Sequence, residues 1–174
     1  MKKLFIWTFV VGVVLGAAVM AWGYISFKGN AVLESKEFYV SRNTTYDELI
    51  DSLKPSIKHH FAFDIYAERL ALKENYKVGH YVVKDGMNVI EIVRMFKLGL
   101  QTPVKVTMNN VKIPAQLAGK LSKQFEADSA EFVQVLTDKA LAKKLGFDNP
   151  LTMFSIFIPN TYEVYWTMTA DQLF

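Results

Sequence analysis

Residues near the C-terminal end combine side-chain types that bind sugars or donate protons. The segment between positions 157 and 166 reads FIPNTYEVYW and places aromatic rings beside an amide and a carboxylate. Aromatic faces can stack on sugar rings, and an amide can hydrogen-bond to hydroxyl groups. We therefore predict a glycan-lining role for a set of residues in this segment: Asn160, Tyr162, Glu163 and Trp166.

Glu163 has two possible roles. It lies between Tyr162 and Tyr165, and desolvation by these rings would favour the protonated carboxyl that a general acid needs. The alternation of Tyr162 and Trp166 with Glu163 also fits a strand whose carboxylate faces solvent. In a third interpretation, the side chains of Pro159, Tyr162 and Trp166 fasten this edge to another domain. The residues alone leave these alternatives open.

Composition excludes several other kinds of chemistry. The chain has no cysteine, so it has neither disulfides nor thiol catalysis. Its histidines, His59, His60 and His80, have no recognisable metal-ligand spacing, so we expect no metal site and no cofactor. The formal net charge of +3 includes two lysines before an apolar segment, and +1 remains after it. We expect no nucleic-acid partner, because no strongly basic face is present.

The N-terminal part predicts a transmembrane anchor. Positions 4 to 27 carry no charge, and this run exceeds the roughly 20 residues that cross a hydrocarbon core. Trp7, Trp22 and Tyr24 lie near its ends, as in aromatic belts, and the lysines before it favour an N-inside orientation. The alternative is a cleaved signal peptide, since positions 17 to 21 read AAVMA. We predict an uncleaved anchor within residues 1–28.

Three segments beyond the anchor repeat one order, a strand, a polar turn and an amphipathic helix. Helices are expected at 46–53 and 89–98, because Thr45 with Glu48, and Asn88 with Glu91, have capping-box spacing. Gly99 is expected to end the second helix. The strands are expected at 37–40, 80–83 and 104–108, with an Asn109–Asn110 turn before a third helix that starts at Pro114 and buries Leu117, Leu121 and Phe125.

Two further helical regions complete the expected fold. One spans 61–75, with an apolar edge of Phe61, Ile65 and Leu72. The other begins after Asp128, buries Phe132, Val135 and Leu136, and continues with a break to Leu145 before Gly146. Strands so few and short predict an α+β fold with a small sheet, and they disfavour a doubly wound parallel sheet.

The ordered motifs resemble a known family. Residues 79–108 are similar to the LysM-like region of MltG-type (YceG-like) endolytic murein transglycosylases, and the matching positions are Gly79, Tyr81, Gly86, Gly99 and Gln101. The IPNTYEVYW segment resembles the family's Phe-Pro-Asp-Thr-Tyr motif, with Asn160 in place of Asp. Its sequence is most similar to that of the Bacteroidota branch of the family. Phe154 and Ser155 stand where many members have Glu-Gly.

The resemblance also implies where the catalytic residue lies. In the family a glutamate follows Ala-Ser and two aliphatic residues on a downstream helix, and no such string occurs before Phe174. The expectation is that this Glu lies beyond Phe174 and that the chain as given is inactive. The implied domains are 1–28 (cytoplasmic tip and anchor), 29–108 (LysM-like region) and 109–174 (helical region and a truncated start of the catalytic domain).

The implied reaction cleaves the β-1,4 bond between MurNAc and GlcNAc and leaves 1,6-anhydro-MurNAc ends. One carboxyl suffices, because it can protonate the leaving oxygen and then accept the proton of the attacking 6-hydroxyl. The implied partners are peptidoglycan strands, the membrane and cell-wall synthases, with a single pass through the inner membrane and the rest in the periplasm. The alternative is a non-enzymatic, membrane-tethered module that binds peptidoglycan or envelope proteins. Whether the LysM-like region binds glycan or only spaces the next domain stays open.

Overall fold

A computed structural model describes residues 2–108, 113–153 and 160–173. The chain forms two compact units. The first comprises Met1–Phe38, Asn43–Lys77 and Tyr81–Leu100, and the second comprises Tyr39–Arg42, Val78–His80 and Gln101–Phe174. The expected turn at Asn109–Asn110 and the motif residues Phe154, Ser155, Ile158 and Pro159 lie outside the described residues.

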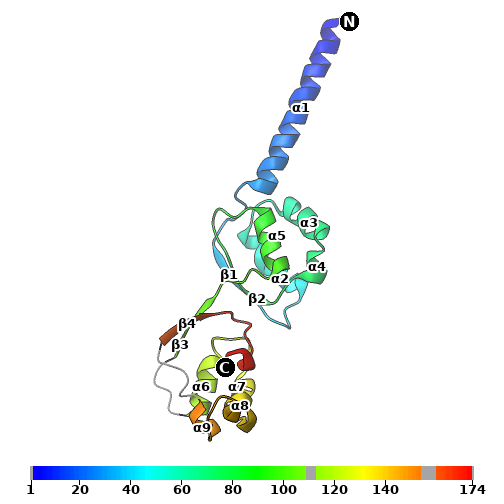
Figure 1. The fold of residues 1–174 in the computed structure, drawn as a ribbon. Helices are drawn as coiled ribbons and strands as arrows, with labels where there is room; N and C mark the ends of the chain where they lie inside the picture. The colour runs from blue at the N-terminus through cyan, green and yellow to red at the C-terminus, as the bar shows by residue number, and fades with distance from the viewer. Residues whose placement is uncertain (1, 109–112, 154–159, 174) are drawn as a thin grey trace. The chain divides into compact units, whose positions relative to one another are not determined.

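The first unit begins with one long helix, α1 (Lys2–Lys28) (Figure 1). Its segment Ile6–Lys28 has a mean hydropathy of 2.0 and is long and apolar enough to cross a membrane. Its side chains from Ile6 to Met20 are exposed, as expected of a surface that meets lipid.

Two short strands and five helical segments follow α1. Strand β1 (Lys36–Val40) pairs with β2 (Gly79–Val83) in a two-stranded sheet, of which the residues up to Phe38 and from Tyr81 onward belong to the first unit. The helices are α2 (Tyr46–Leu53), the 3-10 turn η1 (Lys54–Ser56), α3 (His60–Arg69), α4 (Leu72–Asn75) and α5 (Val89–Leu98). Large apolar side chains fill the core between them, among them Leu53, Phe63, Tyr81 and Phe96.

Both predicted capping boxes of the first unit are confirmed. The Thr45 hydroxyl accepts a hydrogen bond from the Glu48 N–H, and the Glu48 carboxylate accepts one from the Thr45 N–H. That backbone hydrogen bond lowers the pKa of the Glu48 carboxyl. Asn88 and Glu91 make the same pair of bonds at α5, and Gly99 ends that helix at φ 68°. Each box satisfies N–H groups that a helix start leaves without partners.

The prediction of one helix over 61–75 is wrong in two respects. The helix breaks between α3 and α4, where Ala71 adopts a left-handed φ of 48°. The apolar edge was also misassigned, because Phe61 and Ile65 are exposed and only Leu72 is buried. The buried face of α3 carries Ala62, Phe63 and Ala67 instead. Spacing alone could not separate these two faces, since both carry apolar residues at helical intervals.

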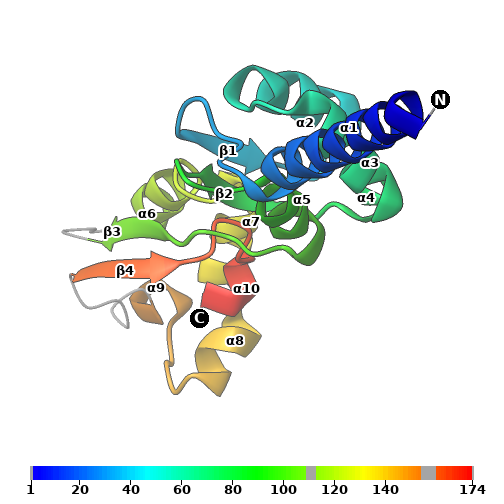
Figure 2. The ribbon, with the colours of Figure 1, turned by 90° about the horizontal axis from the view of Figure 1, so that it is seen from above.

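The second unit packs a two-stranded sheet on helices. Strand β3 (Val104–Met108) pairs antiparallel with β4 (Asn160–Val164), in a register that sets Val106 opposite Tyr162 (Figures 1 and 2). The helices are α6 (Pro114–Leu121), α7 (Ser129–Leu136), α8 (Lys139–Lys144), α9 (Pro150–Met153) and α10 (Ala170–Leu173). The core includes Val106, Leu117, Leu121, Phe125, Phe132 and Leu136.

Most local predictions in the second unit are confirmed. Pro114 occupies the first turn of α6, and the Asp128 carboxylate caps α7 by accepting the Glu131 N–H. The break after α7 is also present, and α8 ends before Gly146, whose φ is 86°. The fold class is the expected mixture of helices and small sheets. The strand at 104–108 pairs within the second unit and joins β4 rather than β1 or β2.

Candidate functional site

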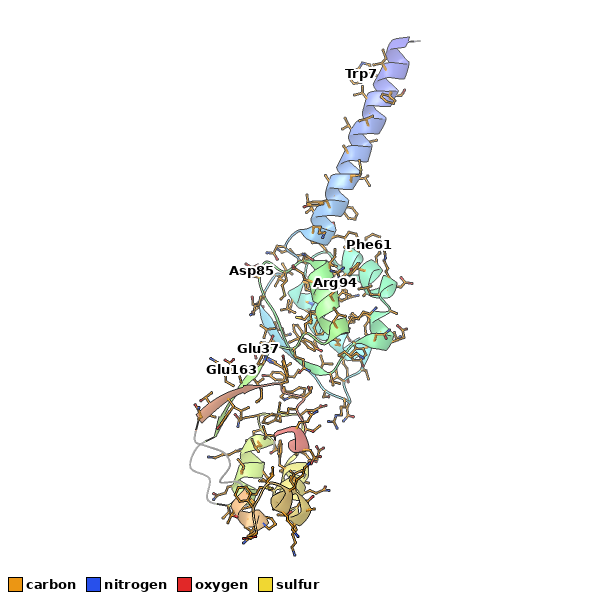
Figure 3. The ribbon with its side chains drawn as sticks, viewed as in Figure 1. Trp7, Glu37, Phe61, Asp85, Arg94 and Glu163 are labelled. Carbon is orange, nitrogen blue, oxygen red and sulfur yellow. The ribbon has the colours of Figure 1, made fainter. Side chains whose placement is uncertain are left out.

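The outer face of the β3–β4 ribbon presents a polar surface. Successive strand residues point to opposite sides, so Lys105 and Thr107 share one face with Thr161 and Glu163. The Thr107 and Thr161 hydroxyl oxygens lie 3.1 Å apart, and the Lys105 Nζ lies 3.9 Å from the Glu163 Oε1. Figure 3 labels Glu163 on this ribbon. Hydroxyl, ammonium and carboxylate groups at these positions can hydrogen-bond to sugar hydroxyls.

The opposite face of the ribbon belongs to the core. Tyr162 and Val164 pack with Val104 against the cluster that contains Val106 and the helices α6 and α7. Tyr162 therefore does not share a face with Glu163. Asn160 lies exposed at the start of β4, where its Oδ1 accepts the N–H of Thr161 at 2.8 Å. The side-chain amide nitrogen of Asn160 could donate a hydrogen bond to a sugar hydroxyl.

Trp166 lies beyond β4 in an aromatic cluster of the second unit. The Tyr39 ring contacts the Trp166 ring edge-on at a centroid distance of 5.3 Å. The Tyr39 ring also stacks on the His80 ring, at a centroid distance of 4.5 Å. His80 is buried, and its Nδ1 lies 2.9 Å from the carbonyl oxygen of Thr102. Because a carbonyl oxygen only accepts hydrogen bonds, the His80 Nδ1 carries a proton.

Gly79 leaves room for the side chain of Gln101 next to this aromatic cluster. A Cβ on Gly79 would lie 2.6 Å from the Gln101 Cγ, so only glycine leaves this space. The amide of Gln101 in turn meets the hydroxyl of Thr167, with its Nε2 at 3.0 Å and its Oε1 at 3.2 Å. Gly79 thus leaves room for the Gln101 side chain, and Gln101 bonds to Thr167, the residue after Trp166.

Glu126 is the more enclosed of the two carboxylates near this part of the chain. Its side chain is 11% exposed, against 66% for Glu163. Its Oε1 accepts the backbone N–H of Arg42 at 2.6 Å, and its Oε2 lies 3.4 Å from the Arg42 Nε. Its own N–H donates to the carbonyl oxygen of Trp166. Glu126 is therefore engaged in joining the Arg42 segment to the end of β4.

The structure separates the four residues that the sequence put together. Glu163 lies on the outer face of the ribbon, Tyr162 lies on the core face, and Trp166 contacts Tyr39. Sequence reasoning missed Tyr39, His80 and Glu126. No local signal could have found them, because each meets its partners across 22 or more positions of the chain, and only tertiary packing joins such distant residues.

A hollow of about 360 Å³ lies in the first unit, and no predicted site residue lines it. Its lining includes Tyr46, Leu72 and the carboxylates of Asp64, Glu68 and Glu74. Burial and then the nearby charges of Asp64 and Glu74 raise the pKa of Tyr46. Across residues 2–108, 113–153 and 160–173, no group of three or more acidic or histidine side chains is placed to hold a metal ion.

Comparison with known families identifies the relationship. The model of the YceG-like family matches residues 38–174. The chain belongs to the YceG-like family. This is the MltG family of endolytic transglycosylases. The match starts at Phe38, within β1, so it covers the rest of that strand, all of β2, the polar ribbon and the aromatic cluster.

The chain was also compared with solved structures and with curated proteins. A crystal structure of a YceG-like protein from Listeria monocytogenes is similar over 80% of this chain and 52% of that protein, at 18% identity and a TM-score of 0.35. The chain thus spans about half the length of the Listeria protein. No curated protein matches the chain.

Proposed function

We propose that this protein is part of a membrane-anchored, endolytic peptidoglycan transglycosylase. The observation that carries the proposal is the match of the YceG-like family over residues 38–174. The enzyme would cleave the β-1,4 bond between MurNAc and GlcNAc inside a glycan strand and leave 1,6-anhydro-MurNAc ends. By doing so it would end or trim nascent strands beside the cell-wall synthases.

The proposed reaction needs one carboxyl group in two successive states. As an acid it protonates the glycosidic oxygen as that bond breaks, and as a base it takes the proton of the MurNAc 6-hydroxyl, which attacks the anomeric carbon. Such a group requires an enclosed, partly apolar site that keeps it protonated near neutral pH. Glu163 lacks that enclosure, because it is 66% exposed and faces Lys105. We therefore assign the acid to a glutamate in a longer form of the protein.

The described residues then have the role of holding the glycan. In this proposal the outer face of the β3–β4 ribbon hydrogen-bonds to sugar hydroxyls through Thr107, Thr161 and Glu163, and Asn160 adds an amide at its end. Trp166 and Tyr39 contribute aromatic surface next to the ribbon. Tyr162 supports the ribbon from the core face and does not itself contact the strand.

The proposed location follows from α1. A helix that is long and apolar enough to cross a membrane precedes the family region. Paired lysines before the apolar run and its aromatic ends favour a single pass with the following residues outside. We place α1 in the inner membrane and both strand-containing units in the periplasm, within reach of newly made glycan.

The test uses uncrosslinked glycan strands and the longest natural form of the protein. Mass spectrometry of the products should show anhydro-MurNAc ends that increase with time. Ordinary reducing ends would indicate a hydrolase, and intact strands would remove the enzymatic assignment. The 174-residue chain serves as the matched control, which should bind strands without shortening them.

One observation favours a second candidate function. Within the part of the chain that the structure describes, neither Glu163 nor Glu126 is presented to a substrate from an enclosed, aromatic-walled site. A tethered module that binds peptidoglycan without cleaving it fits this arrangement. Strand binding by the longest natural form without any new ends would support the module over the enzyme.

A further inference from the structure

An exposed apolar edge runs along the start of α3. Phe61 is 65% exposed and Ile65 is 42% exposed, and residues four apart in a helix lie on the same side. The other side of α3 carries the buried Ala62, Phe63 and Ala67. Because Phe61 also touches Trp22 of the apolar helix α1, this edge continues an apolar surface and is a candidate for contact with another apolar phase.

A ring contact fixes where this edge lies along α1. The Phe61 ring centroid is 6.4 Å from that of Trp22, six residues before the last residue of α1. With a rise of 1.5 Å per residue, Trp22 lies roughly 9 Å below the end of the helix. Figure 3 shows Phe61 beside this end of α1, whereas Trp7 lies near the opposite end. Phe61 therefore shares the depth of a residue inside the apolar span.

The backbone holds the start of α3 at the same level. The N–H of Lys58 donates to the carbonyl oxygen of Ala31, three residues after α1 ends. The N–H of Ala31 donates to the carbonyl oxygen of Met87, just before α5 begins. Both α3 and α5 thus start next to the point where the chain leaves α1. The opposite end of α5, at Leu98, is roughly 15 Å further along its axis.

We propose that Phe61 and Ile65 insert into the boundary between headgroups and acyl chains of the bilayer that α1 crosses. The proposal rests on the membrane anchoring proposed above. An uncharged run of 24 residues is roughly 6 Å longer than a 30 Å hydrocarbon core, so Trp22, roughly 8 Å from the end of the run, lies within about 5 Å of the edge of that core, close to the layer where aromatic rings are enriched. A ring in contact with Trp22 reaches the edge of the core as well.

The charges near the exit suit the same position. Lys28 ends α1, and Lys58 precedes α3 on a segment tied to Ala31. Ammonium groups at this level meet lipid phosphates, while the apolar edge meets the upper acyl chains. The first unit would thereby rest on the membrane through a second contact and not swing freely from α1. This contact would set the height at which the family region stands above the bilayer.

The test reads the depth of single positions in the 174-residue chain. The chain has no cysteine, so Phe61→Cys, Ile65→Cys and Leu98→Cys each carry one environment-sensitive NBD label. Leu98 is the matched control, because its exposure of 61% equals that of Phe61 within a few per cent and it lies at the far end of α5. The variants are reconstituted into phosphatidylethanolamine–phosphatidylglycerol vesicles with nitroxide on the upper acyl chain.

The expected result is stronger quenching at positions 61 and 65 than at 98, by about threefold or more, with a blue-shifted emission. Equal quenching at 61 and 98 in vesicles that carry the protein would overturn the proposal and leave the anchor intact. A blue shift at 61 without quenching would also overturn it, since a protein partner would then cover the edge. Failure to float with the vesicles would overturn the anchor and this proposal together. Circular dichroism checks that each variant is folded.

Discussion

The two units organise their elements in different ways. In the first unit, α2 and α5 carry their own start signals, since each has a reciprocal capping box within four residues. In the second unit, the sheet joins β3 to β4, whose paired residues Val106 and Tyr162 are 56 positions apart. The first arrangement can form from local contacts, whereas the second requires a long chain closure before any strand bond forms. Local signals therefore describe the helix starts of both units, and they do not describe the pairing of β3 with β4.

Removing a core ring from each unit is the strongest way to break this comparison. Phe96 is fully buried against Tyr81 at 4.8 Å, and Phe132 is fully buried against Phe125 at 5.6 Å. Phe96→Ala and Phe132→Ala should each lower the free energy of unfolding by about 3–5 kcal/mol, because each leaves a cavity. Hydrogen exchange should show the loss within the unit that carries the change. If both substitutions expose amides of α5 and α7 alike, the two units unfold as one.

The pH dependence of stability should single out Tyr81 in the first unit. Burial raises the pKa of its hydroxyl to about 12, and the hydroxyl donates to the carbonyl oxygen of Lys77. The folded pKa lies above the unfolded value, so this stabilisation is complete below pH 10 and is lost as pH rises towards about 12. We expect the free energy of unfolding to fall by about 2–3 kcal/mol over that window.

The control for this titration is Tyr81→Phe, measured by urea unfolding at each pH. It should start about 1 kcal/mol lower at neutral pH, because the Lys77 carbonyl loses its partner, and then show a flatter decline. An equally steep decline in the variant would assign the alkaline loss to other groups.

In the second unit, Gly79→Ala tests the close approach to Gln101. The new Cβ would lie 2.6 Å from the Gln101 Cγ, so a cost of about 1–2 kcal/mol is expected from overpacking. Adding Gln101→Ala should relieve most of that clash. The matched control is Gly119→Ala in α6, where a Cβ meets nothing within 4 Å and should stabilise the helix by about 0.5–1 kcal/mol. Equal effects at both glycines would refute the steric explanation.

Helix caps allow a finer comparison between the units. Asn88→Ala at α5 and Asp128→Ala at α7 should each cost about 1 kcal/mol in thermal unfolding, because each removes a side-chain acceptor for an N–H of the first turn. Substitutions of the third helical residue, Glu91 in α5 and Glu131 in α7, should differ in their cost to stability. Glu91 accepts the N–H of Asn88, and so Glu91→Ala should cost a few tenths more than Glu131→Ala, roughly the value of one exposed bond. The reverse order would contradict the reciprocal box at α5.

The smallest effect on stability is expected at Glu163. It is exposed, and its distance to the Lys105 Nζ is 3.9 Å, so Glu163→Gln should change the free energy of unfolding by less than about 0.5 kcal/mol. In the longest natural form, Glu163→Gln should still yield anhydro-MurNAc ends, as should Lys105→Gln. A loss of product on the order of a thousandfold with Glu163→Gln alone would identify Glu163 as the proton donor instead.

Prediction from sequence succeeded where the cause was local and failed where it was not. The helix starts at Thr45, Asn88 and Asp128 follow from side chains that bond to N–H groups three residues on. The edge of α3 was misassigned because Phe61 and Ala62 lie on neighbouring faces, and only the packing of α3 decides which face is buried. The candidate site depended on such packing throughout, since Tyr39 and His80 reach Trp166 from far along the chain.

The sequence by itself determined the apolar N-terminal helix, the capped helices, the α+β class and the YceG-like resemblance, because each depends on residue types at short, fixed spacings. The tertiary structure alone decided that β3 pairs with β4, that Glu163 faces Lys105 rather than the aromatic rings, and that Phe61 meets Trp22. These contacts depend on which surfaces bury one another after the chain has closed, and no short spacing records that choice.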